Sequence, residues 1–207
     1  MHLKLIREQS IQTSKQLGVD VSPMLPLLDA RLEMRSVDEA ISRLLAMNAV
    51  AAIAYGFDRA KAIAWLNQEA LSDSLSEQEK RFVFEEMGNR DLFKVQVESM
   101  WALAWALGIT NDLNFARDCD NRFVTMLPNL KQSESSVAVR KKMNPHSLEQ
   151  VVAACDLAYC LHWAIRQSEL NGKQSPRNLK PYVVVERRRA LEWLLSKEAW
   201  DKIPFDT

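Results

Sequence analysis

The sequence predicts an all-α fold: a compact, irregular bundle of about eight helices with buried central helices, forming a single domain over residues 1–207. Three observations lead to this prediction. Glycines fall where helical patterns end, capping residues fall where they begin, and no convincing run of residues alternates as a half-buried strand would. A length of 207 residues suits one domain, or one with a small appendage, and is enough to bury a core.

Glycines and capping residues mark the predicted ends of the helices. Every glycine follows a helical stretch: Gly18, Gly56, Gly88, Gly108 and Gly172. Glycine is favoured just beyond a helix because it adopts the left-handed conformation without steric cost. Three of the predicted starts carry a capping box: Ser36-x-x-Glu39, Ser76-x-x-Glu79 and Ser147-x-x-Gln150. Asp58 and Asp91 are expected to be simple N-caps.

These signals divide the chain into eight expected helices. They cover residues 3–17, 36–55, 58–72, 76–87, 91–107, 115–126, 147–171 and 182–196. Val183, Val184 and Val185 could form a strand, but they lead directly into a strong helical pattern. Residues 129–146 are polar and lack periodicity, so we expect a long loop that is mobile, functional or both.

Three stretches are apolar on nearly every side, namely 44–55, 100–107 and 151–165. A helix that is apolar all round is buried all round. We therefore expect these stretches to form the centre of the bundle, with amphipathic helices wrapped around them.

The charge of the chain limits its partners. The net charge is zero, which argues against a nucleic-acid-binding protein because such proteins normally carry a basic excess. Charge is nevertheless uneven: residues 67–91 hold seven acids against three bases, and residues 166–189 hold seven bases against two acids. These runs are either solvated helix faces or a contact that steers a partner or an anion electrostatically.

The sequence predicts a cytoplasmic protein that does not enter a membrane. Its first residues contain no apolar segment typical of a signal peptide. The most apolar stretch, 151–165, is too short for a membrane span and contains Asp156 and His162. The three cysteines show no disulfide framework spacing, which fits reduced thiols in the cytosol.

Six polar residues interrupt otherwise apolar helix faces and form the candidate site. They are Glu98, Asp156, His162, Arg166, Glu186 and Arg187. An ionised carboxylate on an apolar face is costly to bury without a partner, and Arg187 or Arg166 could supply one for Asp156. Two interpretations stay open: a buried ion-pair network that fixes how helices dock, or a polar pocket with shifted pKa values that binds a ligand.

Specific chemistries find little support in the sequence. Cys155 and His162 are too far apart along one helix to share a metal ion, and no Glu-x-x-His pair occurs. His146-x-x-Glu149 has a plausible spacing but stands alone. No phosphate loop, dinucleotide fingerprint or nucleophile elbow is present, so we expect no metal, no cofactor and no identifiable catalytic residue.

Several segments also resemble a known family. They are LP at 25–26, MRSVDEAISRLLAM at 34–47, LSEQE at 75–79, ESMWALAWALG at 98–108, CDLAYCLHWAIR at 155–166, VVVERRRALEWL at 183–194 and WDKIPFDT at 200–207. In these the chain resembles the bacterial family of domains of unknown function numbered 4272. The resemblance implies a helical fold and no established activity. The family usually has arginine in place of Cys160, which argues against a site requiring a cation there.

The function expected from the sequence is therefore general. We expect a protein-interaction or binding module of accessory or toxin-neutralising type rather than an enzyme. It would contact a protein partner through its uneven charge and residues 129–146, and would bind neither nucleic acid nor membrane. The alternative is a small-ligand-binding protein or an enzyme that uses a pocket of buried acids and Arg187 between helices.

Overall fold

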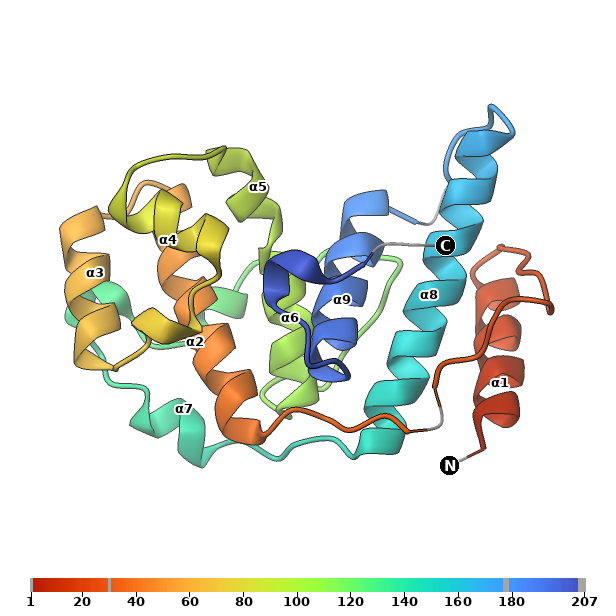
Figure 1. The fold of residues 1–207 in the computed structure, drawn as a ribbon, viewed down its shortest axis with the longest axis horizontal. Coiled ribbons are helices and arrows are strands. Elements are labelled where there is room, and N and C mark those ends of the chain that lie inside the picture. The colour runs from red at the N-terminus through yellow and green to blue at the C-terminus, as the bar shows by residue number, and fades with distance from the viewer. Residues whose placement is uncertain (1, 30, 177–178, 205–207) are drawn as a thin grey trace.

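The computed structural model describes residues 2–29, 31–176 and 179–204, and over these ranges it contains helices and no strand (Figure 1). The all-α prediction is confirmed. The α-helices are α1 (Leu3–Gln16), α2 (Val37–Ala54), α3 (Arg59–Gln68), α4 (Glu77–Phe84), α5 (Arg90–Val95), α6 (Val97–Ala106), α7 (Val137–Lys141), α8 (Leu148–Leu170) and α9 (Pro181–Leu194). Short 3-10 turns are η1 (Ser72–Ser74), η2 (Phe123–Met126), η3 (Leu130–Gln132) and η4 (Trp200–Lys202).

The long helices lie roughly side by side in a row (Figure 1). Helices α2, α6, α9, α8 and α1 follow one another across the molecule, and each contacts the next. Helices α3, α4 and α5 gather around α2 at one end of the row, and α1 forms the other end, where it packs on α8. The order along the row differs from the order along the chain, so neighbouring helices are joined by contacts between distant segments.

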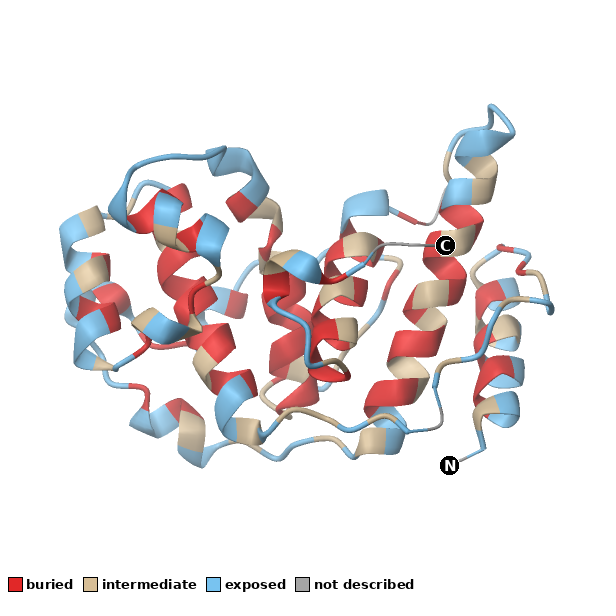
Figure 2. Ribbon diagram, in the orientation of Figure 1, coloured by how far each residue is buried: buried red, intermediate tan, exposed pale blue. Residues whose placement is uncertain are grey.

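The expected central helices are buried, as the red ribbon in Figure 2 shows. Residues 44–54 of α2 and 100–107 around α6 are almost entirely inaccessible to solvent. In the stretch 151–165, the residues that face α9 and α1 are buried, and Ala153, Ala154, Leu157, Tyr159 and Trp163 are half-buried. None of the helices in the described ranges has the length and apolar character needed to cross a membrane.

The local signals for helix starts are confirmed with one exception. All three capping boxes form, at Ser36, Ser76 and Ser147. In each, the serine hydroxyl accepts from the backbone N–H of the third helical residue, and the side chain of that residue accepts from the backbone N–H of the serine. Asp58 caps α3 as expected. Asn89 rather than Asp91 caps α5, because its side chain accepts from the N–H of Asp91.

The predicted helix at 91–107 is two helices, α5 and α6, which meet at Gln96. Each of the two helices then makes its own contacts. Phe93 stacks on Phe82 of α4 with ring centroids 4.4 Å apart, and Glu98 lies against α9. Helices α3 and α4 also end earlier than expected, at Gln68 and Phe84.

The predicted helix at 115–126 is wrong: within it only η2, at Phe123–Met126, is helical. Polar side chains bond to nearby backbone instead. Asn114 accepts from the N–H of Ala116, and Asp120 accepts from the N–H of Arg122. Such bonds offer the backbone an alternative to the helix, which is why Asn and Asp favour turns.

The segment 129–146 is more ordered than a structureless loop. It contains η3 and α7, and its backbone is tied to the bundle. The indole of Trp65 donates to the carbonyl oxygen of Glu134 at 2.8 Å, and the N–H groups of Asn144 and His146 donate to carbonyls at the end of α6. The polar composition that suggested mobility instead reflects an exposed but anchored connection.

The turn after α6 depends on Gly108, which has φ +67°. A Cβ atom at this position would lie 2.0 Å from the carbonyl oxygen of Asn144. Gly172, also at φ +67°, has nothing within 4 Å of its would-be Cβ. Substituting each of the two glycines therefore distinguishes the free-energy cost of the left-handed backbone conformation from that of a steric clash.

We expect Gly172→Ala to lower the free energy of unfolding by about 1 kcal/mol, the penalty for placing an L-residue in the left-handed region. Gly108→Ala adds a clash with backbone and should cost about 3 kcal/mol. Urea unfolding of the two variants and the wild type measures the difference. Equal losses would show that the 144–146 segment does not pack against Gly108 as the structure has it.

Candidate functional site

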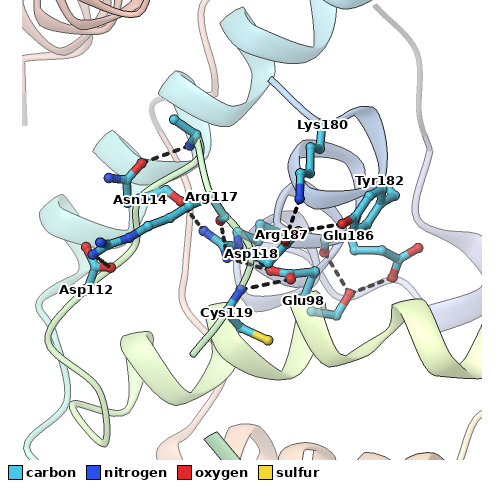
Figure 3. Close-up of polar contacts among 12 residues, drawn as sticks. Glu98, Asp112, Asn114, Arg117, Asp118, Cys119, Lys180, Tyr182, Glu186 and Arg187 are labelled. Atoms are coloured by element: carbon cyan, nitrogen blue, oxygen red, sulfur yellow. Dashed lines mark hydrogen bonds and ion pairs between the residues drawn. The ribbon is translucent and has the colours of Figure 1, made fainter. Parts of the chain in front are cut away.

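The six candidate residues do not form one cluster; the structure divides them among separate polar groups. The first joins α6 to α9. The Nε of Arg187 donates to Oε2 of Glu98 at 2.9 Å, and its Nη2 donates to the same oxygen at 2.5 Å (Figure 3). Both side chains are almost completely buried, with exposed fractions of 1% and 2%.

The Glu98–Arg187 pair also holds the backbone of the segment that follows α6 (Figure 3). The N–H of Cys119 donates to the second carboxylate oxygen of Glu98 at 3.0 Å. Arg187 donates to the carbonyl oxygens of Asn114 and Arg117. These bonds use backbone groups that a helix would need for itself, which is a second reason why residues 115–126 are not helical.

Asp118 ties the same segment to the start of α9. Its carboxylate accepts from Lys180 Nζ and from the Tyr182 hydroxyl. The bond from Lys180, followed by that from Tyr182, lowers the pKa of Asp118. The segment 112–120 is thus fixed from inside by Arg187 and Glu98 and from outside by Lys180 and Tyr182.

Glu186 lies beside this pair but has its own contacts. Ser99 Oγ lies 2.8 Å from one carboxylate oxygen of Glu186 and 2.7 Å from its backbone oxygen, and Arg189 lies 3.4 Å from the other carboxylate oxygen. Burial raises the pKa of Glu186, and the charge of Arg189 counteracts part of this effect.

Asp156 pairs with a residue that the sequence analysis did not consider. Arg7 of α1 donates from Nη2 to Oδ1 of Asp156 at 2.8 Å and from Nε to Oδ2 at 3.1 Å, a two-pronged contact. Arg7 also donates to the carbonyl oxygens of Leu25 and Pro26. Burial is the largest single effect and would lower the pKa of Arg7, but the bond to Asp156 and the charge interactions with Cys160, Asp156 and Tyr159 together outweigh it, so the pKa is raised.

His162 faces Arg188 rather than an acid. Its Nδ1 lies 2.6 Å from Nη1 of Arg188, and Arg188 Nε donates to Glu192 at 2.6 Å. Since a guanidinium only donates, Nδ1 of His162 accepts, and the ring proton of the neutral form is on Nε2. Burial, followed by the charges of Arg188 and Arg166, lowers the pKa of His162 to about 4. Arg166 itself is exposed and pairs with Glu169 at 2.6 Å, so it stays outside these groups.

A further buried ion pair, between Arg43 and Glu79, was not predicted because Glu79 had been assigned another role. The sequence predicts Glu79 as the last residue of a capping box and as one of the seven acids of 67–91, both on the surface. Its carboxylate accepts from the N–H of Ser76 and also from both terminal nitrogens of Arg43, at 2.5 and 2.8 Å. Arg43 stacks over Trp200 with its guanidinium carbon 4.1 Å from the ring centroid. A lone arginine within the apolar run of α2 was the signal that could have revealed it.

These groups are closed rather than open. Neither of two recesses on the described surface, of about 330 and 290 Å³, is lined by Glu98, Asp156 or Glu186. Each of the three acids is at most 6% exposed and hydrogen-bonded to a named partner. The geometry therefore favours the interpretation as a network that fixes helix docking.

Most bases of the run at 166–189 are buried or paired with acids, and Lys173 is exposed. Arg187 and Arg188 are buried, and Arg166, Lys180 and Arg189 pair with acids. Arg177 of this run lies outside the residues that the structure describes. Most of the positive charge that could attract an anion to this run is therefore used in ion pairs within the molecule.

The described residues also show no arrangement suited to a reactive cysteine or to a bound metal ion. Burial, followed by the nearby charge of Glu98, raises the pKa of the Cys119 thiol to about 12, so that it stays protonated and weakly nucleophilic at neutral pH. Cys155 and Cys160 are buried free thiols. Within the described ranges, no three His, Cys, Asp or Glu side chains are grouped so as to hold a metal ion.

A different feature emerges on the surface, at the turn from α4 to α5. Residues 84–92 are all exposed, and three of them are large and apolar: Phe84 at 47%, Met87 at 58% and Leu92 at 58% (Figure 2). Monomeric proteins expose single apolar side chains often, but clusters of them mark interaction sites. The sequence analysis read this stretch only as the end of a helix, a glycine and a cap.

The 84–92 segment is anchored at both ends by contacts of the residues that flank it. Arg59 of α3 donates to the carbonyl oxygens of Phe82 and Val83, which the end of α4 leaves without helical partners. Its guanidinium also lies over the ring of Phe82, which stacks on Phe93. The exposed side chains are thus presented on a fixed base rather than on a free loop.

Residues 6–203 match the family described as Domain of unknown function (DUF4272). No curated protein and no solved structure matches the chain. The resemblance in the sequence segments thus extends over nearly the whole chain.

We expect Glu98→Gln to lower the free energy of unfolding by about 3 kcal/mol, because it leaves the Arg187 charge buried without a counter-charge. The amide of Cys119 should also exchange its hydrogen faster. Replacing both residues by methionine should recover most of the loss. Urea unfolding with hydrogen exchange measures both effects.

The control is Glu169→Gln in the exposed Arg166–Glu169 pair, which should cost less than about 1 kcal/mol. A Glu98→Gln variant no less stable than this control would contradict a docking role for the buried pair.

His162 should make the protein less stable in mild acid. Its pKa is about 4 in the folded chain against 6.5 ordinarily, so between these values the unfolded chain binds more protons. The free energy of unfolding must then fall as the pH decreases from 6.5 to about 4. The melting temperature should fall less over this pH range in His162→Gln, because glutamine stays neutral. An equal fall in wild type and variant would refute a depressed pKa of His162. An NMR titration of its imidazole with a midpoint near 6.5 would refute it as well.

Proposed function

The chain belongs to the DUF4272 family, and we propose that it is a protein-interaction module that docks its partner on residues 84–92. The observation that carries the proposal is the exposure of Phe84, Met87 and Leu92 on one short segment whose flanking residues are anchored. Phenylalanine and methionine are enriched at protein interfaces, where a few such side chains supply most of the binding free energy.

Rigidity supports this use of the segment. Binding orders exposed side chains and loops at a cost in free energy, and a surface that is already fixed avoids much of it. Arg59 anchors the end of α4, and the Phe82–Phe93 stack supports the start of α5. Glu86 adopts φ +58° just beyond α4, and the N–H of Met87 donates back to the carbonyl oxygen of Arg81 at 3.1 Å, which closes the turn locally.

The charge of the segment specifies the partner. Glu85, Glu86 and Asp91 outnumber the one base of the segment, Arg90, although Glu86 pairs with Arg59 at 3.7 Å and Asp91 with Lys94 at 2.9 Å. Acids next to exposed apolar side chains favour a protein whose contact surface is apolar and carries lysine or arginine. Electrostatic attraction of this kind acts chiefly on the association rate and on the choice of partner.

The segment 129–146 stays a second part of the proposed contact. Val137 is 53% exposed, and Lys131, Lys141 and Lys142 are exposed around it. Its ties to the bundle make it another preformed surface, of opposite charge to 84–92.

The cellular setting is part of the same proposal. We place the protein in the bacterial cytoplasm, in an accessory role such as neutralising a toxin. Three free thiols support this location, because the cytoplasm keeps cysteines reduced. Alkylation of the thiols in freshly lysed cells checks it: thiols already oxidised there would contradict a cytoplasmic location.

The docking surface is tested by placing a photo-crosslinking residue at Met87 in the cells that naturally make the protein. We expect a discrete adduct with one partner protein, because Met87 lies at the centre of the exposed segment. The adduct should disappear when Phe84→Ser and Leu92→Ser are added. Both side chains are substantially exposed, so the melting temperature should change little.

The matched control is the same crosslinking residue at Met24, which is 86% exposed and lies before α2, far along the chain from the proposed surface. It should give no such adduct. Identical adducts from both positions, or an adduct that survives the double serine variant, would show that residues 84–92 are not the contact.

A further inference from the structure

Residues 199–203, which we call the strap, carry the end of the chain from α9 across to α4, and their turn η4 is drawn dark blue in Figure 1. The turn spans three residues. Trp200 and Ile203 are each 5% exposed, and the indole of Trp200 meets that of Trp193 edge to face with ring centroids 5.8 Å apart. Buried side chains rather than a long run of backbone bonds therefore hold the strap in place.

The strap supports the beginning of α4 in two ways. Its Trp200 ring covers Arg43, whose guanidinium carbon lies 4.1 Å from the ring centroid and whose terminal nitrogens both donate to Glu79 of α4. One residue further along, Oδ2 of Asp201 accepts from the N–H of Gln78 in the first turn of α4 at 3.1 Å. A carboxylate at this end of a helix also interacts favourably with the helix dipole.

Helix α4 depends on such support because it is short. It has eight residues, fewer than an isolated helix needs to be stable in water. At its far end the N–H groups of Glu85 and Met87 donate to the carbonyl oxygen of Arg81 at 3.0 and 3.1 Å, and this closes the turn from which 84–92 begins. A loss of support at the first turn of α4 would therefore loosen 84–92, although the two ends of the helix lie about 12 Å apart along its axis.

Two buried hydrogen-bond donors weaken the closed strap. Nε1 of Trp200 and Nε of Arg43 are buried and have no acceptor among the residues that the structure describes. A buried donor without an acceptor shifts an equilibrium against the buried state by about fivefold or more, because the same group bonds to water when it is exposed. Apolar burial of Trp200 and Ile203 thus favours the closed strap, and the two donors oppose it. Segments held by such a balance are the ones that open locally while the rest of a protein stays folded.

We propose that the strap is a regulatory latch: it opens while the bundle stays folded, and its opening loosens α4 and the segment 84–92. The regulatory role rests on the proposed function, in which 84–92 is the docking surface. Linkage then works in both directions, so a partner that binds the ordered form of 84–92 also holds the strap closed. The coupling between strap and segment is a property of the chain alone and needs no partner.

Native-state hydrogen exchange of the full chain, followed by NMR, tests this coupling. Asp201→Ala removes the bond to Gln78 and should open the strap more often. We expect the distant amides of Glu85 and Met87 to exchange about fivefold faster, the effect of losing one capping bond. The amides of α8 should keep their rates, because the bundle itself does not unfold. The control is Asp73→Ala, which removes an exposed acid of η1, the turn before α4, and should leave all these rates unchanged.

A second variant acts in the opposite direction. Benzothienylalanine in place of Trp200 has a ring of nearly the same shape with sulfur where the indole has its N–H. A synthetic peptide of residues 199–207 brings it into the chain by ligation to residues 1–198 and refolding. The ligation needs Ala199→Cys, at an exposed position, and the reference chain is ligated in the same way with tryptophan at 200. Without the unpaired donor the strap should open less often, so Glu85 and Met87 should exchange about fivefold more slowly or slower still.

Changes of opposite sign in the two variants, at Glu85 and Met87 but not in α8, would support the latch. It would be overturned if Asp201→Ala accelerated exchange at Gln78 alone, or if it accelerated every amide of the bundle by one common factor. Exchange no slower in the benzothienyl chain than in its reference would overturn it as well.

Photo-crosslinking from Met87 then separates the latch from the proposed function. The yield of the partner adduct should fall in Asp201→Ala, whose 84–92 segment is ordered for less of the time. Coupled exchange without any adduct in the wild type would contradict docking at 84–92 and leave the latch standing. An adduct of full yield in Asp201→Ala, together with unchanged exchange at Glu85 and Met87, would contradict the latch and leave the docking surface standing.

Discussion

The ion pair between Glu98 and Arg187 is the contact on which the arrangement of the bundle most depends. It lies between the two central helices, α6 and α9, and reaches from there into the backbone of the segment around Cys119. Its desolvation is costly, so its effect is better described as selection than as net stabilisation. A shifted register between α6 and α9 would leave two charges buried without partners. The pairs Arg7–Asp156 and Arg43–Glu79 act in the same way at α1–α8 and α2–α4.

The helices themselves were predictable because their ends are encoded locally. A capping box needs only four consecutive residues, and a glycine with positive φ needs only its own backbone freedom. The partners of the buried charges were not predictable in this way. Asp156 meets Arg7, which is 149 residues away, although Arg166 lies much closer in the sequence and shares its helix. Helical spacing identified Glu98, Asp156 and Glu186 as exceptional but carried no information about which helix would face each of them.

The errors of the prediction occur where tertiary bonds replace helical ones. Residues 115–126 have helical spacing, yet Glu98 and Arg187 take backbone groups that a helix would use. The opposite happens in 129–146, where Trp65 and the end of α6 order a segment without any periodicity. The exposed apolar side chains of 84–92 were not predicted either. From the sequence, an apolar residue at the end of a helix is expected to be buried, and only the structure shows whether another element covers it.

The pairing of Arg7 with Asp156 has a consequence for how the chain is made. Helix α1 leaves the ribosome before α8, the helix on which it rests, because Asp156 is synthesised 149 residues after Arg7. At ordinary rates of elongation this interval is roughly seven to thirty seconds. During that time α1 has only its own turns and the nearby carbonyls of Leu25 and Pro26 to hold it, and a helix of 14 residues is marginal alone in water. Helix α1 must therefore remain pliable until α8 has been made, and it can take its final place only then.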